Sequence, residues 1–153
     1  MDPNAGRLSL DVTATNPLPT FSICIPVFNR ERVITRALRS CLQQNGNDFE
    51  IVVTDDHSSD GTILAIEALQ DARIRLVRHR SNQGHGPARN SAIEAALGNW
   101  IIELDSDDEL LPNGLDHIRA AVQAASPDVD CLEFMYQRDD GCCSPDPPWP
   151  MDA

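Results

Sequence analysis

The 153 residues and 41% hydrophobic content of this chain suffice for one domain with a real core, and not for two. The net charge of -12, from 24 acidic against 12 basic residues, argues against nucleic acid and against an anionic membrane surface as partners. All 12 basic residues are arginine, and the absence of lysine excludes P-loop ATPases, Schiff-base enzymes and lysine nucleophiles.

The cysteines and the apolar segments indicate the cellular compartment of the protein. The five cysteines are odd in number and lack C-x-x-C spacing, so we expect neither a disulfide framework nor a zinc site. No apolar run approaches the roughly 20 residues that span a bilayer. Residues 1–19 also lack the basic start and apolar core of a signal peptide. We therefore expect a soluble, cytoplasmic protein without a membrane span.

Strands and helices are predicted to alternate along the chain. Residues 21–28 form a β-branched and aromatic run typical of a strand, and apolar residues then recur at helical spacing over 33–42. Residues 49–54 are nearly all apolar, as in a parallel strand covered on both faces. The later elements are expected at 63–69 (helix), 74–77 (strand), 87–97 (helix, with Pro87 at its first position), 100–104 (strand), 112–125 (helix) and 129–136 (strand).

This order predicts an α/β fold with a doubly wound, mostly parallel sheet of the Rossmann-like kind. We expect a flexible segment over 1–19, the domain itself over 20–136 and a Pro-rich unstructured tail over 137–153. In such folds ligands bind beyond the carboxyl ends of the strands. Nearly every unusual polar residue follows a predicted strand, within the segments 26–30, 55–60, 79–89 and 105–108.

Four carboxylates crowd directly after the predicted strand at 100–104, on Asp105, Asp107, Asp108 and Glu109. Their mutual repulsion opposes folding unless a cation or a set of donors lies between them. Carboxylate oxygens at alternate positions suit Mg²⁺ or Mn²⁺, which keep water and phosphate oxygens as their other ligands. An isolated D-x-D in an acidic protein is more often a solvated loop. The predicted strand that directly precedes this D-x-D motif favours a metal site that binds a phosphate ester.

Four sequence segments together resemble the nucleotide-sugar-binding half of the family two glycosyltransferases, an inverting group with the GT-A fold. They are ICIPVFNR, IVVTDDHSSDGT, NQGHGPARNSAI and WIIELDSDDELLP, in family order and spacing within residues 20–125. The resemblance implies a nucleoside-diphosphate sugar as donor and Mn²⁺ or Mg²⁺ as cofactor. It also implies inverting transfer of the sugar to an acceptor hydroxyl, with the acceptor class (saccharide, lipid or protein) left open.

The resemblance assigns the nucleotide pocket by position. Pro26, Phe28 and Asn29 would form its wall, with Phe28 packing on the flat base, although plain core packing of Phe28 is the alternative. Asp56 would accept a hydrogen bond from a ring N–H of the base. Capping of the next helix is at least as good an explanation as ligand contact for three neighbouring residues, Asp55, Ser58 and Asp60.

The same resemblance assigns the phosphate and metal side. Arg89 of the A-R-N signature would pair with the diphosphate or with a pocket carboxylate, against the alternative of a surface ion pair. Asp107 would bind the metal, while Asp105 would lie by the ribose and the metal's water. The loop histidines His57 and His85 receive no catalytic role.

Inverting transfer also needs a general base, and no residue of the chain is marked as one. In relatives the base comes from the later half of the domain, so we expect a truncated domain whose unfinished sheet tends to self-associate. The main hypothesis is a transferase whose acceptor half is missing or lies on another chain, and the alternative is an inert nucleotide-sugar-binding fragment. A haloacid-dehalogenase phosphatase ranks third, because its nucleophilic aspartate should follow the first strand, which here ends in Pro-Val-Phe-Asn.

Overall fold

A computed structural model describes residues 18–134, 136–137 and 143–144. The chain divides into two compact units, Met1–Asn113 and Gly114–Ala153. The first unit contains β1 (Phe21–Val27), α1 (Ile34–Leu42), β2 (Phe49–Asp55), α2 (Thr62–Glu67), β3 (Ile74–Arg78), α3 (His85–Ala95) and β4 (Trp100–Glu103). The second contains α4 (Gly114–Ala124), β5 (Tyr136–Gln137) and β6 (Cys143–Ser144).

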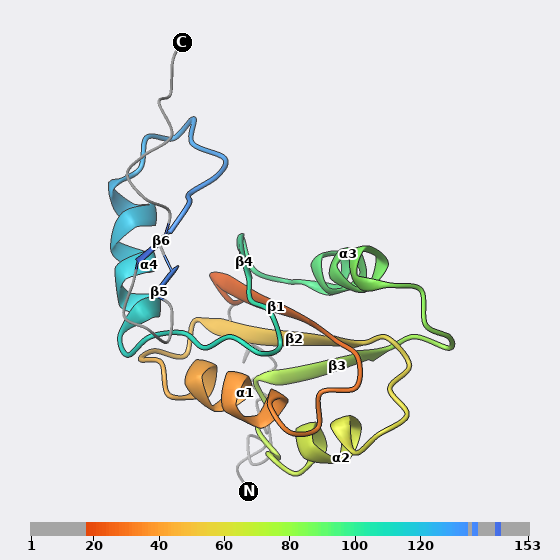
Figure 1. The fold of residues 1–153 in the computed structure, drawn as a ribbon. Helices are drawn as coiled ribbons and strands as arrows, with labels where there is room; N and C mark the ends of the chain where they lie inside the picture. The colour runs from red at the N-terminus through yellow and green to blue at the C-terminus, as the bar shows by residue number, and fades with distance from the viewer. Residues whose placement is uncertain (1–17, 135, 138–142, 145–153) are drawn as a thin grey trace, which may run out of the picture. The chain divides into compact units, whose positions relative to one another are not determined.

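The first unit is built on a four-stranded, wholly parallel sheet in the order β3-β2-β1-β4 (Figure 1). Helices α1 and α2 lie on one side of this sheet and α3 on the other. The register aligns Val27 with Asp55, so the carboxyl ends of the two central strands lie side by side. The predicted α/β fold with a doubly wound, mostly parallel sheet is therefore confirmed.

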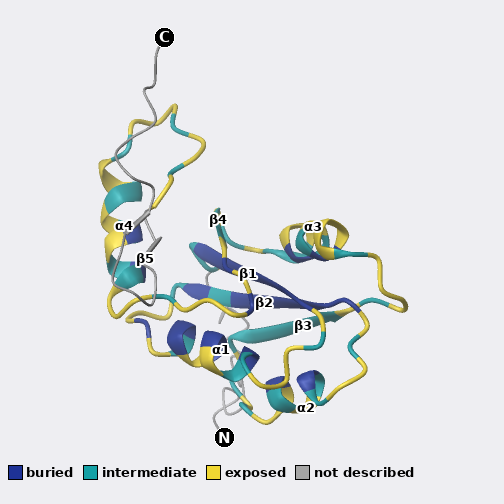
Figure 2. Cartoon of the chain, in the orientation of Figure 1, coloured by how far each residue is buried: buried dark blue, intermediate teal, exposed yellow. Residues whose placement is uncertain are grey.

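The core lies on both faces of β1 and β2 (Figure 2). All seven residues of β1 are buried, which explains why its sequence reads as a continuous run instead of an alternating one. Helix α1 buries an apolar stripe at helical spacing, namely Ile34, Ala37, Leu38 and Cys41. On the other face, α3 packs its small Ala92 against Cys24 and Val52. The small side chains let α3 approach the sheet closely.

Most predicted elements are present, with shifted ends. Helix α3 begins at His85, two residues before the predicted Pro87, because Gly84 has a φ of 96° and its carbonyl accepts the Ala88 N–H. The helix ends at Ala95 and not at residue 97, since the N–H groups of Leu97 and Gly98 donate to side chains of the sheet. Those two amides are thereby removed from the helical hydrogen-bond ladder.

The strand predicted over 129–136 is wrong for most of its length. Residues 129–134 form no strand, and Tyr136–Gln137 alone pairs, antiparallel, with Cys143–Ser144. Exposed Asp130 and Glu133 interrupt the apolar residues there. Residues 1–17 of the predicted flexible segment, and 138–142 and 145–153 of the predicted tail, lie outside the described residues.

Two further observations concern the expectations drawn from composition. The thiols of Cys24, Cys41 and Cys131 are free, the first two buried and the third exposed. In the part of the chain that the structure describes, no helix is long and apolar enough to cross a membrane.

Candidate functional site

A cleft of about 340 Å³ opens at the carboxyl ends of the strands of the first unit. Four stretches of chain line it: Pro26, Val27, Phe28 and Arg30 at the end of β1 and just after it, Asp56 after β2, Asn82, Gly84, His85 and Ala88 around the start of α3, and Ser106 after β4. Strands β2 and β4 flank β1 on opposite sides, so the topological switch point falls here. This is where doubly wound folds bind their ligands. The four segments singled out by sequence therefore meet at one place.

The segment after β1 contributes an aromatic side chain and a loop clamp. Phe28 lines the cleft and is 41% exposed, so its ring is available to a ligand. Pro26 also lines the cleft, from within the buried strand. Asn29 adopts a left-handed φ of 52° and accepts the Ser59 N–H at 2.9 Å, while its own N–H donates to Ser58 Oγ at 2.9 Å. Asn29 thus ties the loop after β1 to the loop after β2.

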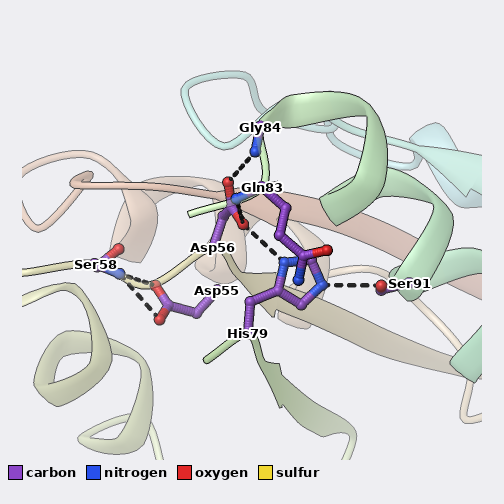
Figure 3. A network of polar contacts seen from close by, with 7 residues as sticks. All are labelled: Asp55, Asp56, Ser58, His79, Gln83, Gly84 and Ser91. Atoms are coloured by element: carbon purple, nitrogen blue, oxygen red, sulfur yellow. Dashed lines mark hydrogen bonds and ion pairs between the residues drawn. The ribbon is translucent and has the colours of Figure 1, made fainter. Parts of the chain in front are cut away.

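The carboxylate of Asp56 is almost fully buried at the cleft and has three hydrogen-bond partners (Figure 3). Its Oδ1 accepts the Gln83 N–H at 2.9 Å and lies 2.7 Å from His79 Nδ1, and its Oδ2 accepts the Gly84 N–H at 2.7 Å. Burial by itself raises the pKa of Asp56, but these hydrogen bonds together outweigh burial and lower it. The carboxylate is therefore ionised at neutral pH.

The polar residues between Asp56 and α2 serve the fold. The Asp55 carboxylate accepts the Ser58 N–H at 3.2 Å, which closes a turn. Asp60 accepts the Thr62 N–H at 3.0 Å and the Glu31 N–H at 3.2 Å. Burial raises the pKa of Asp60, but the hydrogen bonds from Thr62 and Glu31 lower it overall. Of the three residues for which helix capping was an explanation, only Asp60 contacts the start of α2, through Thr62. Asp55 closes a turn and Ser58 binds the Asn29 N–H, so neither caps this helix.

Arg89, on α3, faces the carboxylates of β4 and of the acidic loop. Its guanidinium lies 3.6 Å from Glu103 Oε2 and 3.6 Å from Asp105 Oδ1. It also donates to His85 Nε2 at 2.9 Å, and His85 lies 3.8 Å from Asp105. The Arg89 Nε is buried without a hydrogen-bond partner. Arg89 and Asp105, both predicted site residues, thus lie within ion-pair distance of each other.

The acidic loop after β4 exposes Asp107 and is fixed through its backbone. Asp107 O accepts a hydrogen bond from Arg36 of α1 at 2.8 Å, and the Asp108 N–H closes a turn onto Asp105 O at 3.0 Å. Ser40 Oγ, one turn further along α1, accepts the Leu110 N–H at 3.0 Å. Gln44, just beyond the end of α1, donates from Nε2 to the Leu111 carbonyl at 3.1 Å. Among the described residues, no three His, Cys, Asp or Glu side chains form a ready-made metal cage.

Sequence reasoning missed two residues that shape the site, His79 and Arg36. His79 directly follows β3, so its position at a carboxyl end could have marked it. Arg36 is 71 positions away from Asp107 in the chain and lies on the exposed face of a helix. No local pattern distinguishes it from a solvated arginine.

Comparison with known proteins agrees with this architecture. Residues 22–141 match the model of Glycosyl transferase family 2, so the chain belongs to that family. It is 39% identical over 124 residues to the succinoglycan biosynthesis protein ExoO of Rhizobium meliloti, covering 80% of this chain and 36% of that protein. It is 38% identical over 115 residues to the UDP-Glc:alpha-D-GlcNAc-diphosphoundecaprenol beta-1,3-glucosyltransferase WfgD of Escherichia coli, covering 75% of this chain and 44% of that protein.

Solved structures show the same fold. The S. aureus TarS fragment 1-349 in complex with UDP-GlcNAc superposes with a TM-score of 0.65 at 31% identity, covering 68% of this chain and 31% of that chain. The mannosyltransferase PcManGT from Pyrobaculum calidifontis, in complex with GDP-Man and Mn2+, gives a TM-score of 0.64 at 26% identity, over 78% of this chain and 37% of that chain. The present chain therefore spans less than half the length of each of these relatives.

Proposed function

We propose that the cleft binds a nucleoside-diphosphate sugar together with a divalent metal, for inverting transfer of the sugar to an acceptor hydroxyl. The observation that carries this proposal is the meeting of the four family segments around one cleft at the switch point. Family membership supports it. So do the relatives with this fold, which hold UDP-GlcNAc, or GDP-Man and Mn2+.

In this proposal the nucleotide lies between Phe28 and Asp56. The exposed Phe28 ring stacks on the base. Asp56 Oδ2 accepts one hydrogen bond within the protein and can accept a second from a ring N–H of the base. Pro26 completes the wall, and Asn29 holds the loop in place. Arg89 offsets negative charge on the diphosphate side, where it already lies beside Asp105.

The donor set of the acidic loop fits Mn²⁺ or Mg²⁺. Such a hard cation needs only one or two protein carboxylates when water and phosphate oxygens complete its coordination. Asp107 is exposed, while Arg36 fixes its backbone, so the carboxylate is presented on a held turn. When bound, the metal would stabilise negative charge on the leaving diphosphate. Asp107 is the proposed ligand, with Asp105 near the ribose and the metal's water.

The acceptor side remains open in this proposal. No described residue is assigned as the general base. A catalytically inert nucleotide-sugar-binding domain is the second candidate, because the cleft can bind a donor without a base. A cytoplasmic location and self-association through the sheet edge are further parts of the proposal.

Calorimetric titration of the full chain with UDP, GDP and dTDP, with and without Mn²⁺, tests the donor site. We expect one nucleotide to bind in a metal-dependent manner, and we expect the Asp107→Ala variant to lose this metal-dependent binding. Asp130→Ala, which removes an exposed aspartate from the second unit, is the matched control and should bind like the wild type. A folded wild-type chain that binds none of the three nucleotides would refute the proposal. Sugar transfer to added acceptors would then separate the transferase from the inert domain.

A further inference from the structure

His79 is a buried polar residue that the proposed function does not use. It follows β3 directly, and its side chain is only 8% exposed. Both ring nitrogens are engaged: Nδ1 lies 2.7 Å from Asp56 Oδ1, and Nε2 lies 2.9 Å from Ser91 Oγ on α3 (Figure 3). The His79 backbone N–H also donates to the Asp55 carbonyl at 2.9 Å. One residue therefore joins the end of β2 to α3.

The chemistry of these groups fixes where the His79 proton lies. An ionised carboxylate only accepts hydrogen bonds, so Nδ1 must carry hydrogen and donate to Asp56. In the neutral ring Nε2 is then the acceptor, and the Ser91 hydroxyl donates to it. The Asp56 carboxylate thus selects the tautomer, and Ser91 satisfies the other ring nitrogen and helps to fix the orientation of the ring.

The Asp56 carboxylate in turn holds the loop between β3 and α3. It accepts the two successive backbone N–H groups of Gln83 and Gly84. Gly84 lines the cleft, and its φ of 96° sets the start of α3. The two backbone N–H groups bind different oxygens of the carboxylate, Oδ1 and Oδ2. The His79 Nδ1–H adds a third donor, on Oδ1, from the end of β3.

We propose that His79 is a positioning residue for the nucleotide site: through its Nδ1–H it orients the Asp56 carboxylate, and thereby the backbone of Gln83 and of its neighbour Gly84, which lines the cleft. This inference rests on the proposed function for its effect on ligand affinity. The effect on the loop itself does not depend on that function. Two readouts therefore follow from it, one on nucleotide binding and one on the loop.

Three substitutions at His79 separate the hydrogen bond from the bulk of the ring. The amide nitrogen of asparagine lies as many bonds from Cα as Nδ1 does, whereas that of glutamine corresponds to Nε2. His79→Asn therefore keeps the donor to Asp56, and His79→Gln and His79→Leu remove it. Nucleotide affinity should stay within about threefold of wild type in His79→Asn and fall by about tenfold or more in the other two. His57→Asn makes the same exchange at an exposed histidine and should change nothing.

The loop readout is hydrogen exchange of the Gln83 and Gly84 amides, measured by NMR in the full chain without ligand. These two amides should stay protected in wild type and His79→Asn, and exchange at least about tenfold faster in His79→Leu, while the amides of the central β1 keep their protection. Retained β1 protection shows that each variant is folded. Should a variant lose it, Ser91→Ala provides the same test from the other side of the ring.

The outcomes distinguish this inference from the proposed function. Wild-type protein that binds no nucleotide refutes the proposed function, and the exchange rates then decide the positioning role alone. Protected Gln83 and Gly84 amides in His79→Leu, or His79→Asn behaving like His79→Leu, would overturn the role of the Nδ1–H donor. If His79→Asn behaves like His79→Leu, the His79 ring contributes only through its packing and not through the hydrogen bond.

Discussion

Asp56 shows how one side chain can serve the fold and a ligand together. Its oxygens hold the loop that starts α3, and yet the residue lines the cleft. A buried carboxylate is tolerated because three donors replace the water it loses. Any substitution of Asp56 is therefore expected to affect stability as well as binding.

Replacing Asp56 with asparagine should destabilise the protein in a pH-dependent way. The new amide would turn one N–H₂ group toward backbone N–H donors, at a cost of about 1–3 kcal/mol in the free energy of unfolding at neutral pH. The hydrogen bonds lower the pKa of Asp56 below its usual value of 3.8, so the charged form stabilises the fold above that pH. This contribution is lost as the pH falls through the pKa of the folded state.

Denaturant unfolding of wild type and Asp56→Asn, followed at neutral pH and again below the usual aspartate pKa, measures both effects. The difference in free energy of unfolding should be large at neutral pH and should shrink in acid. Asp130→Asn, at an exposed position, should behave like wild type at both pH values. A difference that is absent at neutral pH, or that grows in acid, would contradict the account of Asp56.

The cysteine thiols should differ sharply in reactivity. Burial, together with smaller contributions from Glu50 and Glu103, raises the pKa of the Cys24 thiol to about 11, and burial raises the pKa of the Cys41 thiol to about 12. Both thiols are therefore protonated and inaccessible at mildly alkaline pH. Brief alkylation of the native chain, mapped by mass spectrometry, should modify the exposed Cys131 and spare these two. Denatured protein, as the control, should be alkylated at all three, and early modification of Cys24 or Cys41 in native protein would be inconsistent with the core described.

At the scale of the elements, the connection from α3 to β4 depends on a glycine. A Cβ atom on Gly98 would lie 2.7 Å from the Phe21 carbonyl carbon and 2.7 Å from the Ser22 nitrogen, both in the backbone of β1. Gly98→Ala should therefore lower the free energy of unfolding by about 1–3 kcal/mol, because the central strand cannot yield. The matched control is Gly86→Ala, where a Cβ would meet nothing within 4 Å and where alanine favours the helix. Urea unfolding should show a lower free energy of unfolding for Gly98→Ala than for wild type, and no such loss for Gly86→Ala. Equal stability of the two variants would contradict the packing at Gly98.

The elements also show what sequence patterns can and cannot predict. The placement of Asp56 after β2, of Asp107 after β4 and of Arg89 on the helix between β3 and β4 was predictable, because strands and helices alternate in the sequence. The end of α3 was not, since Leu97 donates to Glu50 of β2, 47 positions away. The position of His79 after a strand was visible in the sequence, but its role was not, because that role depends on Asp56, 23 positions earlier, and on Ser91 on the next helix.

The strand predicted over residues 129–136 is the opposite case, because the sequence pattern indicates an element that the structure largely lacks. Its apolar residues matched a strand locally, but Phe134 is 44% exposed and Asp130 and Glu133 are also exposed. A strand needs a neighbouring strand and a buried face, and local propensity supplies neither.

The hydrogen bond from Arg36 to the Asp107 carbonyl could not be predicted from any local pattern either.

For the whole molecule, the described sheet ends in β4, which pairs with β1 and with no second strand among the described residues. An unpaired strand edge is a template for another chain. The purified chain should therefore sediment above the monomer at micromolar concentration, and Ile101→Lys, which adds a charge to β4, should shift it toward the monomer. A wild-type chain that sediments as a monomer at every concentration would show that this edge does not associate.

The central claim is that a metal and a nucleoside diphosphate bind together at the carboxyl ends of these strands. The most direct test is NMR of the uniformly ¹⁵N-labelled chain with its preferred nucleotide and substoichiometric Mn²⁺, because paramagnetic broadening reports where the ion lies. We predict the strongest broadening at residues 105–108, weaker broadening at 27–28 and 83–85, and loss of the pattern in Asp107→Ala. Broadening centred elsewhere, or spread evenly over the chain, would contradict the account.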